Sequence, residues 1–146
     1  MVFLLVLNQN KEMRIADFYI GQKASVSKSF TLEDVRQFAS LSMDSNPIHL
    51  DEEYAAKSMF GRELVHGFLV GSLISSVFGT KLPGPGAIYL HQDLDFRKPV
   101  YHNEEITATV EIVGIKKEKS ILYFNTICTK ADGTVVVEGS AVIKVA

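Results

Sequence analysis

The stretch that decides the fold is Val65–Phe78, with the sequence VHGFLVGSLISSVF. Drawn as a helix, this segment carries apolar side chains on nearly every face, and they are Val65, Phe68, Leu69, Val70, Leu73, Ile74, Val77 and Phe78. A helix that is hydrophobic all round must be buried on nearly all sides. We therefore expect one central helix enclosed by the rest of the domain, with Gly79 as its C-cap. The Pro-Gly-Pro-Gly run at 83–86 forbids any continuation of this helix.

The segments before the central helix predict one strand and two further helices. Gln22–Phe30 alternates apolar and polar residues, which favours a strand. Thr31 begins a helix in which Asp34 completes a variant of the capping box. That helix ends before Asn46-Pro47, because the residue preceding a proline avoids the α region. Asp51–Ser58 opens with acidic residues that suit a helix N-terminus, so it predicts a short helix.

The segments after the central helix all predict strands, and these are Ala87–Phe96, Glu105–Lys116, Ser120–Lys130 and Thr134–Val145. Glu118-Lys119 and Asp132-Gly133 lie where tight hairpin turns belong. One apolar helix with about five strands predicts an α+β fold, in which a curved antiparallel sheet wraps around one long buried central helix. Because such a sheet leaves an edge strand open, we expect two copies to pair edge to edge as a homodimer.

Composition limits the class of protein. The chain has 146 residues, of which 47% are hydrophobic and 22% are charged. These values suit one soluble globular domain and exclude the disordered, fibrous and disulfide-rich classes. A net charge of −2, with Lys and Arg scattered, predicts no nucleic-acid partner. The single Cys128 lies in an apolar alternating run and is expected to be a buried thiol in a reducing compartment.

The apolar runs bear on where the protein is located. Val2–Leu7 is too short for the apolar region of a signal peptide, and Val65–Gly79 is too short to span a bilayer. We therefore expect a cytoplasmic protein with no membrane partner. Residues 1–12 differ in character from the rest of the chain, and we interpret them as an extension that need not be native, with Met13 as the candidate start. We expect a single domain over residues 13–146.

The stretch Phe38–Asp51, FASLSMDSNPIHLD, carries the residues best suited to catalysis. It places Asp44 and His49 five residues apart across an Asn-Pro break, which lets the chain fold back so that both side chains can face one point. A carboxylate and a neutral imidazole around one water form an acid–base pair. An Asp cap on a structural turn, beside a surface His, accounts for the same residue types. The residue types alone leave both interpretations open.

The run Asp44–Asp51, DSNPIHLD, resembles the D-x-N-P-x-H-x-D signature of the MaoC-like (R)-specific enoyl-CoA hydratases. That family, also described as 3-hydroxyacyl-thioester dehydratases, has a hotdog fold. The resemblance covers about residues 20–145 and extends to Phe60-Gly61, Val65-His66-Gly67, LPGPG at 82–86 and FRKPV at 96–100. Met43 departs from the pattern, because Gly or an acidic residue is more typical there. We expect this departure to have little effect on the acid–base pair.

The resemblance implies hydration of a trans-2-enoyl thioester to an (R)-3-hydroxyacyl thioester, and the reverse dehydration. The thioester carrier would be coenzyme A or acyl carrier protein. The catalytic pair that holds the water would be Asp44 and His49. His49 is our candidate for the base and Asp44 for the acid, while the reverse assignment stays open. No metal and no organic cofactor is implied, because the pair supplies the protons.

The resemblance also implies residues that bind or support. The backbone N–H of Gly67 would be the oxyanion donor, at a helix N-terminus where N–H groups lack partners and the helix dipole is positive. Ser75 would supply a supporting hydroxyl in substrate binding, or its hydroxyl would only bond back to its own helix. Asn46 would orient the turn. His66, beside the glycine, would support the site or would only be satisfied by backbone at the helix start.

Other polar residues are expected to lie outside the chemistry. His91 and His102 fall in a strand and a turn, and we interpret them as bystanders. Lys116, Lys117 and Lys119 flank a hairpin and predict a solvated turn, with contact to the phosphates of a carrier as the alternative.

Three other functions fit parts of the sequence. An acyl-CoA thioesterase would use the same fold but direct its water to the carbonyl carbon. A mononuclear iron oxygenase would use the His49-x-Asp51 pair with His91 or His102 as a distal ligand, although such sites normally occur in jelly rolls. A noncatalytic acyl-binding subunit would keep the pair without turnover.

Overall fold

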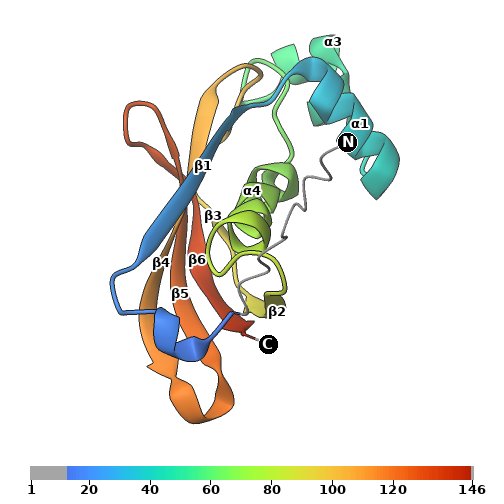
Figure 1. Ribbon diagram of the computed structural model, residues 1–146. Coiled ribbons are helices and arrows are strands. Elements are labelled where there is room, and N and C mark those ends of the chain that lie inside the picture. The colour runs from blue at the N-terminus through green and yellow to red at the C-terminus, as the bar shows by residue number, and fades with distance from the viewer. Residues whose placement is uncertain (1–12, 146) are drawn as a thin grey trace, which may run out of the picture.

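The computed structural model describes residues 13–145, so the extension expected at residues 1–12 lies outside the described residues. At its centre is α4 (Gly67–Thr80), and a six-stranded antiparallel sheet curves around this helix (Figure 1). The strands are β1 (Lys23–Ser29), β2 (Ile88–Gln92), β3 (Asp95–Phe96), β4 (Glu105–Lys116), β5 (Ile121–Lys130) and β6 (Val135–Lys144). Their order is β1-β4-β5-β6-β2, and β3 also pairs with β6. The expected α+β hotdog arrangement is confirmed, with six strands in place of about five.

The additional strand arises because the predicted strand Ala87–Phe96 is interrupted into β2 and β3. At the interruption, a carboxylate oxygen of Asp93 accepts a hydrogen bond from the backbone N–H of Ser140 on β6, at 2.9 Å. Gly139 makes room for this contact, since a Cβ at that position would lie 1.9 Å from the Asp93 carbonyl oxygen. The turn in the chain therefore depends on a contact with residues more than forty positions away in the sequence.

The core is formed where α4 packs on the inner face of the sheet. The helix buries Val70, Leu73, Ile74, Val77 and Phe78, and the sheet contributes buried side chains that include Ile106, Ala108, Val110, Leu122, Phe124 and Ile143. The predicted burial of α4 on nearly all sides is wrong for the single chain, because Phe68 is 69% exposed and Ser72 and Ser75 are also exposed. One face of the helix therefore remains uncovered.

The ends of α4 also differ from the prediction. The helix begins at Gly67, two residues later than expected, with His66 as its N-cap. It continues through Gly79 to Thr80, so the assignment of Gly79 as the C-cap is wrong and Lys81 takes that place. The chain reverses farther on, at Gly84 and Gly86, where φ is +101° and +92°. These left-handed conformations are where glycine is required.

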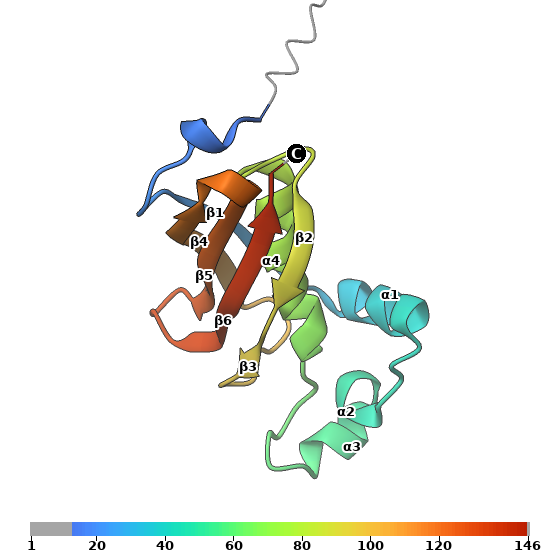
Figure 2. The ribbon, with the colours of Figure 1, turned by 90° about the horizontal axis from the view of Figure 1, so that it is seen from below.

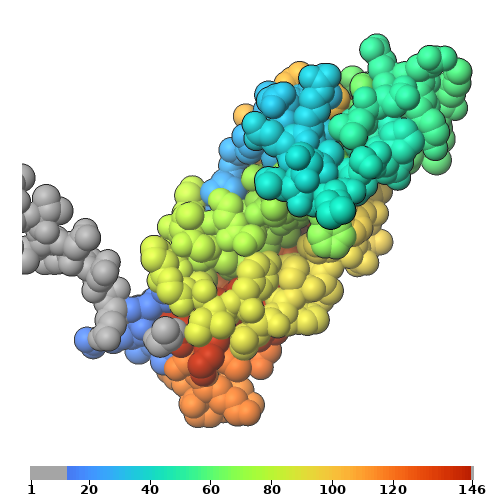
Figure 3. All heavy atoms as spheres, turned by 90° about the vertical axis from the view of Figure 1, so that its right-hand side faces the viewer, coloured from blue at the N-terminus to red at the C-terminus, as the bar shows by residue number. Residues whose placement is uncertain are grey.

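Three helices form a lobe beyond the start of α4, and they are α1 (Leu32–Ser42), α2 (Pro47–Leu50) and α3 (Glu52–Ala56) (Figure 2). The predicted capping box is confirmed, because the Thr31 hydroxyl accepts from the Asp34 N–H while the Asp34 carboxylate accepts from the Thr31 N–H. Asp51 is the N-cap of α3, and its carboxylate accepts a hydrogen bond from the Tyr54 N–H. The single turn α2 was not predicted. A space-filling view shows this lobe at one end of the molecule, beyond the face on which α4 and β2 lie side by side (Figure 3).

The remaining connections are short. A 3-10 turn, η1 (Ile15–Asp17), precedes β1, and η2 (Lys117–Lys119) joins β4 to β5. The tight turn predicted at Glu118-Lys119 is instead this longer connection. It ends at Ser120, whose φ is +54°. The turn at Asp132-Gly133 is confirmed, with φ +87° at Gly133. None of the helices among the described residues has the length and apolar character to cross a membrane.

Candidate active site

The chain turns sharply between α1 and α2, and this corner carries Asp44. Asn46 caps α2 by accepting a hydrogen bond from the Ile48 N–H with its side-chain oxygen, at 3.2 Å. Pro47 occupies the first turn of α2, where its missing N–H costs nothing. The Asp44 carboxylate accepts from the Asn46 N–H at 3.2 Å. These local bonds hold the corner, as the sequence predicted for Asn46, and bring the carboxylate toward α2.

His49 lies on α2 and is oriented by the segment that leads into α4. Its Nδ1 lies 2.8 Å from the Leu64 carbonyl oxygen, and the residue as a whole is 9% exposed. A carbonyl oxygen can only accept, so Nδ1 carries the proton of the neutral imidazole and Nε2 keeps a free lone pair. The Leu64 N–H donates in return to the Ile48 carbonyl, at 3.1 Å. The neutral His49 ring therefore presents a basic nitrogen.

His66 connects the same elements from the other side. Its Nε2 lies 3.0 Å from the backbone carbonyl oxygen of Asp44, so by the same reasoning Nε2 donates. The ring is 2% exposed and stacks on the His49 ring, with centroids 3.8 Å apart, and Phe38 packs against it edge-on. Burial lowers the pKa of His66, which favours the neutral form. The interpretation of His66 as satisfied by backbone holds for Nε2 only, since the buried Nδ1 has no protein partner among the described residues.

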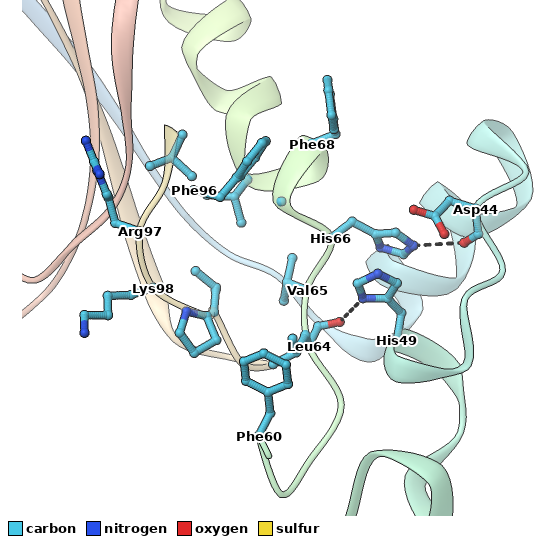
Figure 4. Close-up of a pocket in the computed structure, with 15 residues that line it drawn as sticks. Asp44, His49, Phe60, Leu64, Val65, His66, Phe68, Phe96, Arg97 and Lys98 are labelled. Atoms are coloured by element: carbon cyan, nitrogen blue, oxygen red, sulfur yellow. Dashed lines mark hydrogen bonds between the residues drawn. The ribbon is translucent and has the colours of Figure 1, made fainter. Parts of the chain in front are cut away.

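The corner brings the two predicted catalytic side chains together. One carboxylate oxygen of Asp44 and one nitrogen each of His49 and His66 all lie within 4.8 Å of one another (Figure 4). A metal ion requires ring lone pairs that converge on it. The two imidazole rings stack with planes only 23° apart and centroids 3.8 Å apart, so their in-plane lone pairs lie in two nearly parallel planes and do not converge on one point. The arrangement suits a small hydrogen-bonded molecule between Asp44 and His49 better than a chelated cation.

Gly67 is the first residue of α4 and lines the same pocket. Its N–H belongs to the first helical turn, which has no intrahelical acceptor, and no side chain caps this end of the helix. A partial positive charge accumulates at such an end. The Gly67 amide is therefore suited to an oxygen that gains negative charge.

The pocket has a volume of about 470 Å³ and is mostly apolar. Its walls include Phe60, Leu64, Val65, Phe68, Val70, Phe96, Pro99, Val100 and Val137. Asp44 and His49 lie at one side, and Arg97 and Lys98 lie at the opposite side (Figure 4). Arg97 is paired with Asp95 at 3.2 Å and with Glu138 at 2.9 Å.

Sequence reasoning did not assign these two basic residues or the aromatic walls. The signal for the basic residues was FRKPV at 96–100, which served only as part of the resemblance. The three lysines at 116, 117 and 119 belong to η2 and the adjoining end of β4, and none of them lines this pocket.

Ser75 is not brought to this pocket. It lies eight residues after Gly67 on α4, which is about 12 Å along a helix axis. It lines a separate hollow of about 200 Å³ with Phe78, Gly79, Ala87, Tyr89 and Ile143. The Ser75 side chain therefore lines a different hollow from the one that Gly67 lines.

The residues of the iron-site alternative are also dispersed. The Asp51 carboxylate is used in capping α3, and His91 lies on β2 at 3.5 Å from Asp93. His102 lies in the connection before β4 and does not line the pocket. The His49-x-Asp51 pair therefore does not form a triad with either distal histidine.

Comparison with known proteins gives consistent results. The family described as MaoC like domain matches residues 18–134. An (R)-specific enoyl-CoA hydratase from Rhodospirillum rubrum is 46% identical over 129 residues, which are 88% of this chain and 89% of that protein. A 3-hydroxybutyryl-CoA dehydratase from Methylorubrum extorquens is 36% identical over 140 residues, 96% of this chain and 88% of that protein. Among solved structures, the (R)-hydratase from A. caviae involved in PHA biosynthesis has a TM-score of 0.86 and 43% identity, and covers 88% of this chain and 98% of that one.

Proposed function

The chain belongs to the MaoC-like domain family, and from this membership and the pocket we propose that it is an (R)-specific enoyl-CoA hydratase, a hydro-lyase. It would add water to a trans-2-enoyl thioester and catalyse the reverse dehydration of the (R)-3-hydroxyacyl thioester. The observation that carries the proposal is the meeting of Asp44 and His49 in one apolar pocket with Gly67, at a helix N-terminus that no side chain caps.

The proposed reaction uses one water held between His49 and Asp44. The Nε2 lone pair of His49 accepts a proton from this water as its oxygen bonds to C3 of the substrate. Asp44, as the acid of the pair, delivers a proton to C2. His49 then returns its proton to Asp44, within the 4.8 Å that separates their groups, and the pair is restored. The bond of Nδ1 to Leu64 supports this assignment over the reverse, because it leaves the neutral ring an acceptor facing away from the backbone.

The thioester oxygen would bind at the Gly67 N–H. Addition at C3 shifts electrons onto this oxygen, and a preorganised backbone donor at a helix N-terminus stabilises the charge without reorganisation. One such donor contributes a factor of about 10²–10³ in rate. A side chain at position 67 would also collide with the Phe96 ring, since a Cβ there would lie 2.6 Å from it.

Asn46 and His66 would act as positioning residues. Asn46 fixes the start of α2. His66, which directly precedes Gly67, donates a hydrogen bond to the Asp44 carbonyl and so joins the start of α4 to the corner. The acid, the base and the oxyanion donor are then held relative to one another through the segment 64–67. The charged carrier of the thioester would leave the pocket past Lys98, which is exposed, whereas the charge of Arg97 is offset by two carboxylates.

We also propose a cytoplasmic homodimer. Of the two edge strands, β1 carries Lys23 and Lys28, which discourage pairing, whereas β2 exposes Ile88, Tyr89 and Leu90. Edge-to-edge pairing along β2 would cover these side chains. A reducing compartment suits Cys128, which is fully buried, and burial raises the pKa of its thiol to about 12.

The proposal is tested by hydration of crotonyl-CoA, followed through the absorbance of the enoyl group. Asp44→Asn and His49→Gln should each lower kcat by a factor of about 10²–10⁴ while far-UV circular dichroism stays unchanged. His91→Gln is the matched control, because this exposed histidine lies on β2 outside the pocket.

Full activity in either site variant would refute the mechanism. Release of free thiol from acyl-CoA without loss of enoyl absorbance would instead favour the thioesterase. Absence of turnover with every enoyl thioester would favour the noncatalytic acyl-binding subunit.

A further inference from the structure

The connection from α3 to α4, residues 57–66, carries the carbonyl group on which the orientation of His49 depends. The Leu64 carbonyl oxygen accepts the hydrogen bond of His49 Nδ1 at 2.8 Å, drawn as a dashed line in Figure 4. This bond keeps the proton on Nδ1 and leaves Nε2 as the acceptor that the proposed base needs. The group that fixes Leu64 therefore also fixes the tautomer and the direction of the His49 ring.

Leu64 is attached to two parts of the protein. Toward α2, its N–H donates to the Ile48 carbonyl at 3.1 Å. Toward the sheet, it forms an isolated antiparallel bridge with Tyr101. The next residue, Val65, donates its N–H to the Val100 carbonyl at 2.8 Å. The connection is therefore paired, like a short strand, with the segment that leads into β4.

The side chain of Tyr101 holds the same connection at two further positions. Its hydroxyl donates to the Phe60 carbonyl at 3.2 Å. The guanidinium carbon of Arg62 lies over the Tyr101 ring, 3.8 Å from the ring centroid, where a cation is attracted to the face of the ring. Together with the bridge to Leu64, Tyr101 thus contacts every second residue from 60 to 64.

Tyr101 is itself fixed to the sheet. Its N–H donates to the Glu104 carboxylate at 3.0 Å, and this carboxylate pairs with Lys130 at 3.0 Å. The Nζ of Lys130 also lies 5.5 Å from the centroid of the Tyr101 ring. Lys130 is the last residue of β5, which lies in the middle of the strand order. Tyr101 is therefore a rigid point against which the connection rests.

We propose that Tyr101 is a positioning residue for His49 and acts through Leu64. The inference rests on the proposed hydratase function, in which His49 is the base. Tyr101 does not line the pocket, so its side chain acts on His49 only through the connection.

Replacing the Tyr101 side chain removes its contacts with Phe60 and Arg62 and leaves the backbone bridge alone to hold Leu64. The Leu64 carbonyl is then free to withdraw from Nδ1, and the His49 ring gains access to the tautomer with its proton on Nε2. That tautomer cannot accept a proton from the water at Nε2. A displacement of about 1 Å in a catalytic group costs a factor of about 10² in rate.

The kinetic test measures kcat and KM for hydration of crotonyl-CoA. Tyr101→Leu should lower kcat by about tenfold or more, with a much smaller change in KM, because the base loses its alignment. Tyr101→Phe keeps the ring on Arg62 and loses one neutral hydrogen bond, so it should lower kcat by no more than about fivefold. Tyr123→Leu is the matched control, since this tyrosine is 40% exposed on β5, does not line the pocket and should leave kcat unchanged.

A second measurement does not depend on activity. The ¹⁵N NMR shifts of a neutral imidazole show which ring nitrogen carries the proton, and the signals of His49 are identified by their absence from His49→Gln. At about pH 7.5 the wild-type protein should show the proton on Nδ1, and Tyr101→Leu should show a mixture of the two tautomers. A role of Tyr101 in stability alone would lower the midpoint of unfolding without moving these signals.

The outcomes separate this inference from the function on which it rests. Absence of hydration by the wild-type protein overturns the function, while the NMR measurement still tests the link from Tyr101 to His49. If the wild-type protein is active, an unchanged kcat in Tyr101→Leu overturns the inference. A raised KM with unchanged kcat also overturns it, because Tyr101 would then only shape the pocket wall through Phe60.

Far-UV circular dichroism shows whether Tyr101→Leu is folded. If it is not, Tyr101→Phe and Arg62→Ala take its place, since each removes one contact with the connection. The inference is then overturned if both variants keep the kcat and the His49 tautomer of the wild-type protein.

Discussion

Met43 adopts a backbone conformation that is unfavourable for its side chain. At the C-cap of α1 its φ is +65° and its ψ is +10°, in the left-handed region. A residue with a Cβ pays about 1–2 kcal/mol in this region, whereas glycine adopts it without strain. Met43 is 87% exposed, so contacts of its side chain with the rest of the protein offset little of this cost. The more typical glycine at this place in the family pattern thus has a local physical reason.

Met43→Gly should therefore raise the free energy of unfolding by about 0.5–1 kcal/mol, because relief of backbone strain exceeds the added entropy of the unfolded glycine. Met43→Ala is the control, since it removes the exposed side chain and keeps the Cβ. Urea denaturation of the three proteins measures the difference. Equal stability of the Gly and Ala variants would show that the backbone at this position is unstrained.

Among the helices, strands and turns, features that depend on neighbouring residues could be predicted from the sequence, whereas contacts between distant segments could not. The capping box at Thr31, the corner at Asn46-Pro47 and the turn at Gly133 depend on neighbouring residues, and the structure confirms them. The interruption between β2 and β3 depends on Ser140, far along the chain, and was missed. Asp44 and His49 were predicted to meet because a proline corner folds the chain back. The partner of the His49 ring, Leu64, could not be predicted, since α3 and a loop lie between them in the sequence.

The contact of His66 with Asp44 gives a prediction about pH, because it joins α4 to the corner after α1. Burial lowers the pKa of His66 below its usual value of 6.5, so the native state resists protonation that the unfolded chain accepts. The unfolded state therefore binds more protons below about pH 6.5, and the free energy of unfolding falls as pH decreases through that range.

Replacing His66 by Gln keeps an N–H donor for the Asp44 carbonyl, because the Gln amide nitrogen takes the place of Nε2, and it removes the titrating ring. Urea denaturation at about pH 7.5 and about pH 5.5 should show a smaller loss of stability on acidification for His66→Gln than for wild type. The exposed His91→Gln serves as the reference, and it should lose as much stability as wild type. The interpretation fails if His66→Gln is as sensitive to acid as wild type is.

For the whole molecule, the uncovered surface is concentrated on one side. The exposed side chains of α4 and the exposed apolar side chains of β2 lie next to each other on the face shown in Figure 3. Leu90 is 52% exposed and Ile88 is 44% exposed. Both belong to β2, which pairs with β6 along one edge and leaves its other edge open. Among the described residues, the unpaired backbone edge of β2 and its exposed apolar side chains thus lie at the same place. This is the arrangement expected for pairing with a second copy.

Leu90→Lys should convert the proposed dimer to a monomer, because a charge on the edge strand would have to be buried without a partner. Sedimentation velocity at several protein concentrations measures the change, and far-UV circular dichroism shows whether the variant is folded. Leu41→Lys is the matched control: this leucine is 86% exposed on α1, away from β2, and its replacement should leave the mass of the assembly unaltered. A wild-type protein that sediments as a monomer, or a Leu90→Lys variant that remains dimeric, would exclude pairing through β2. The open face of α4 would then stay exposed to solvent in the functional molecule.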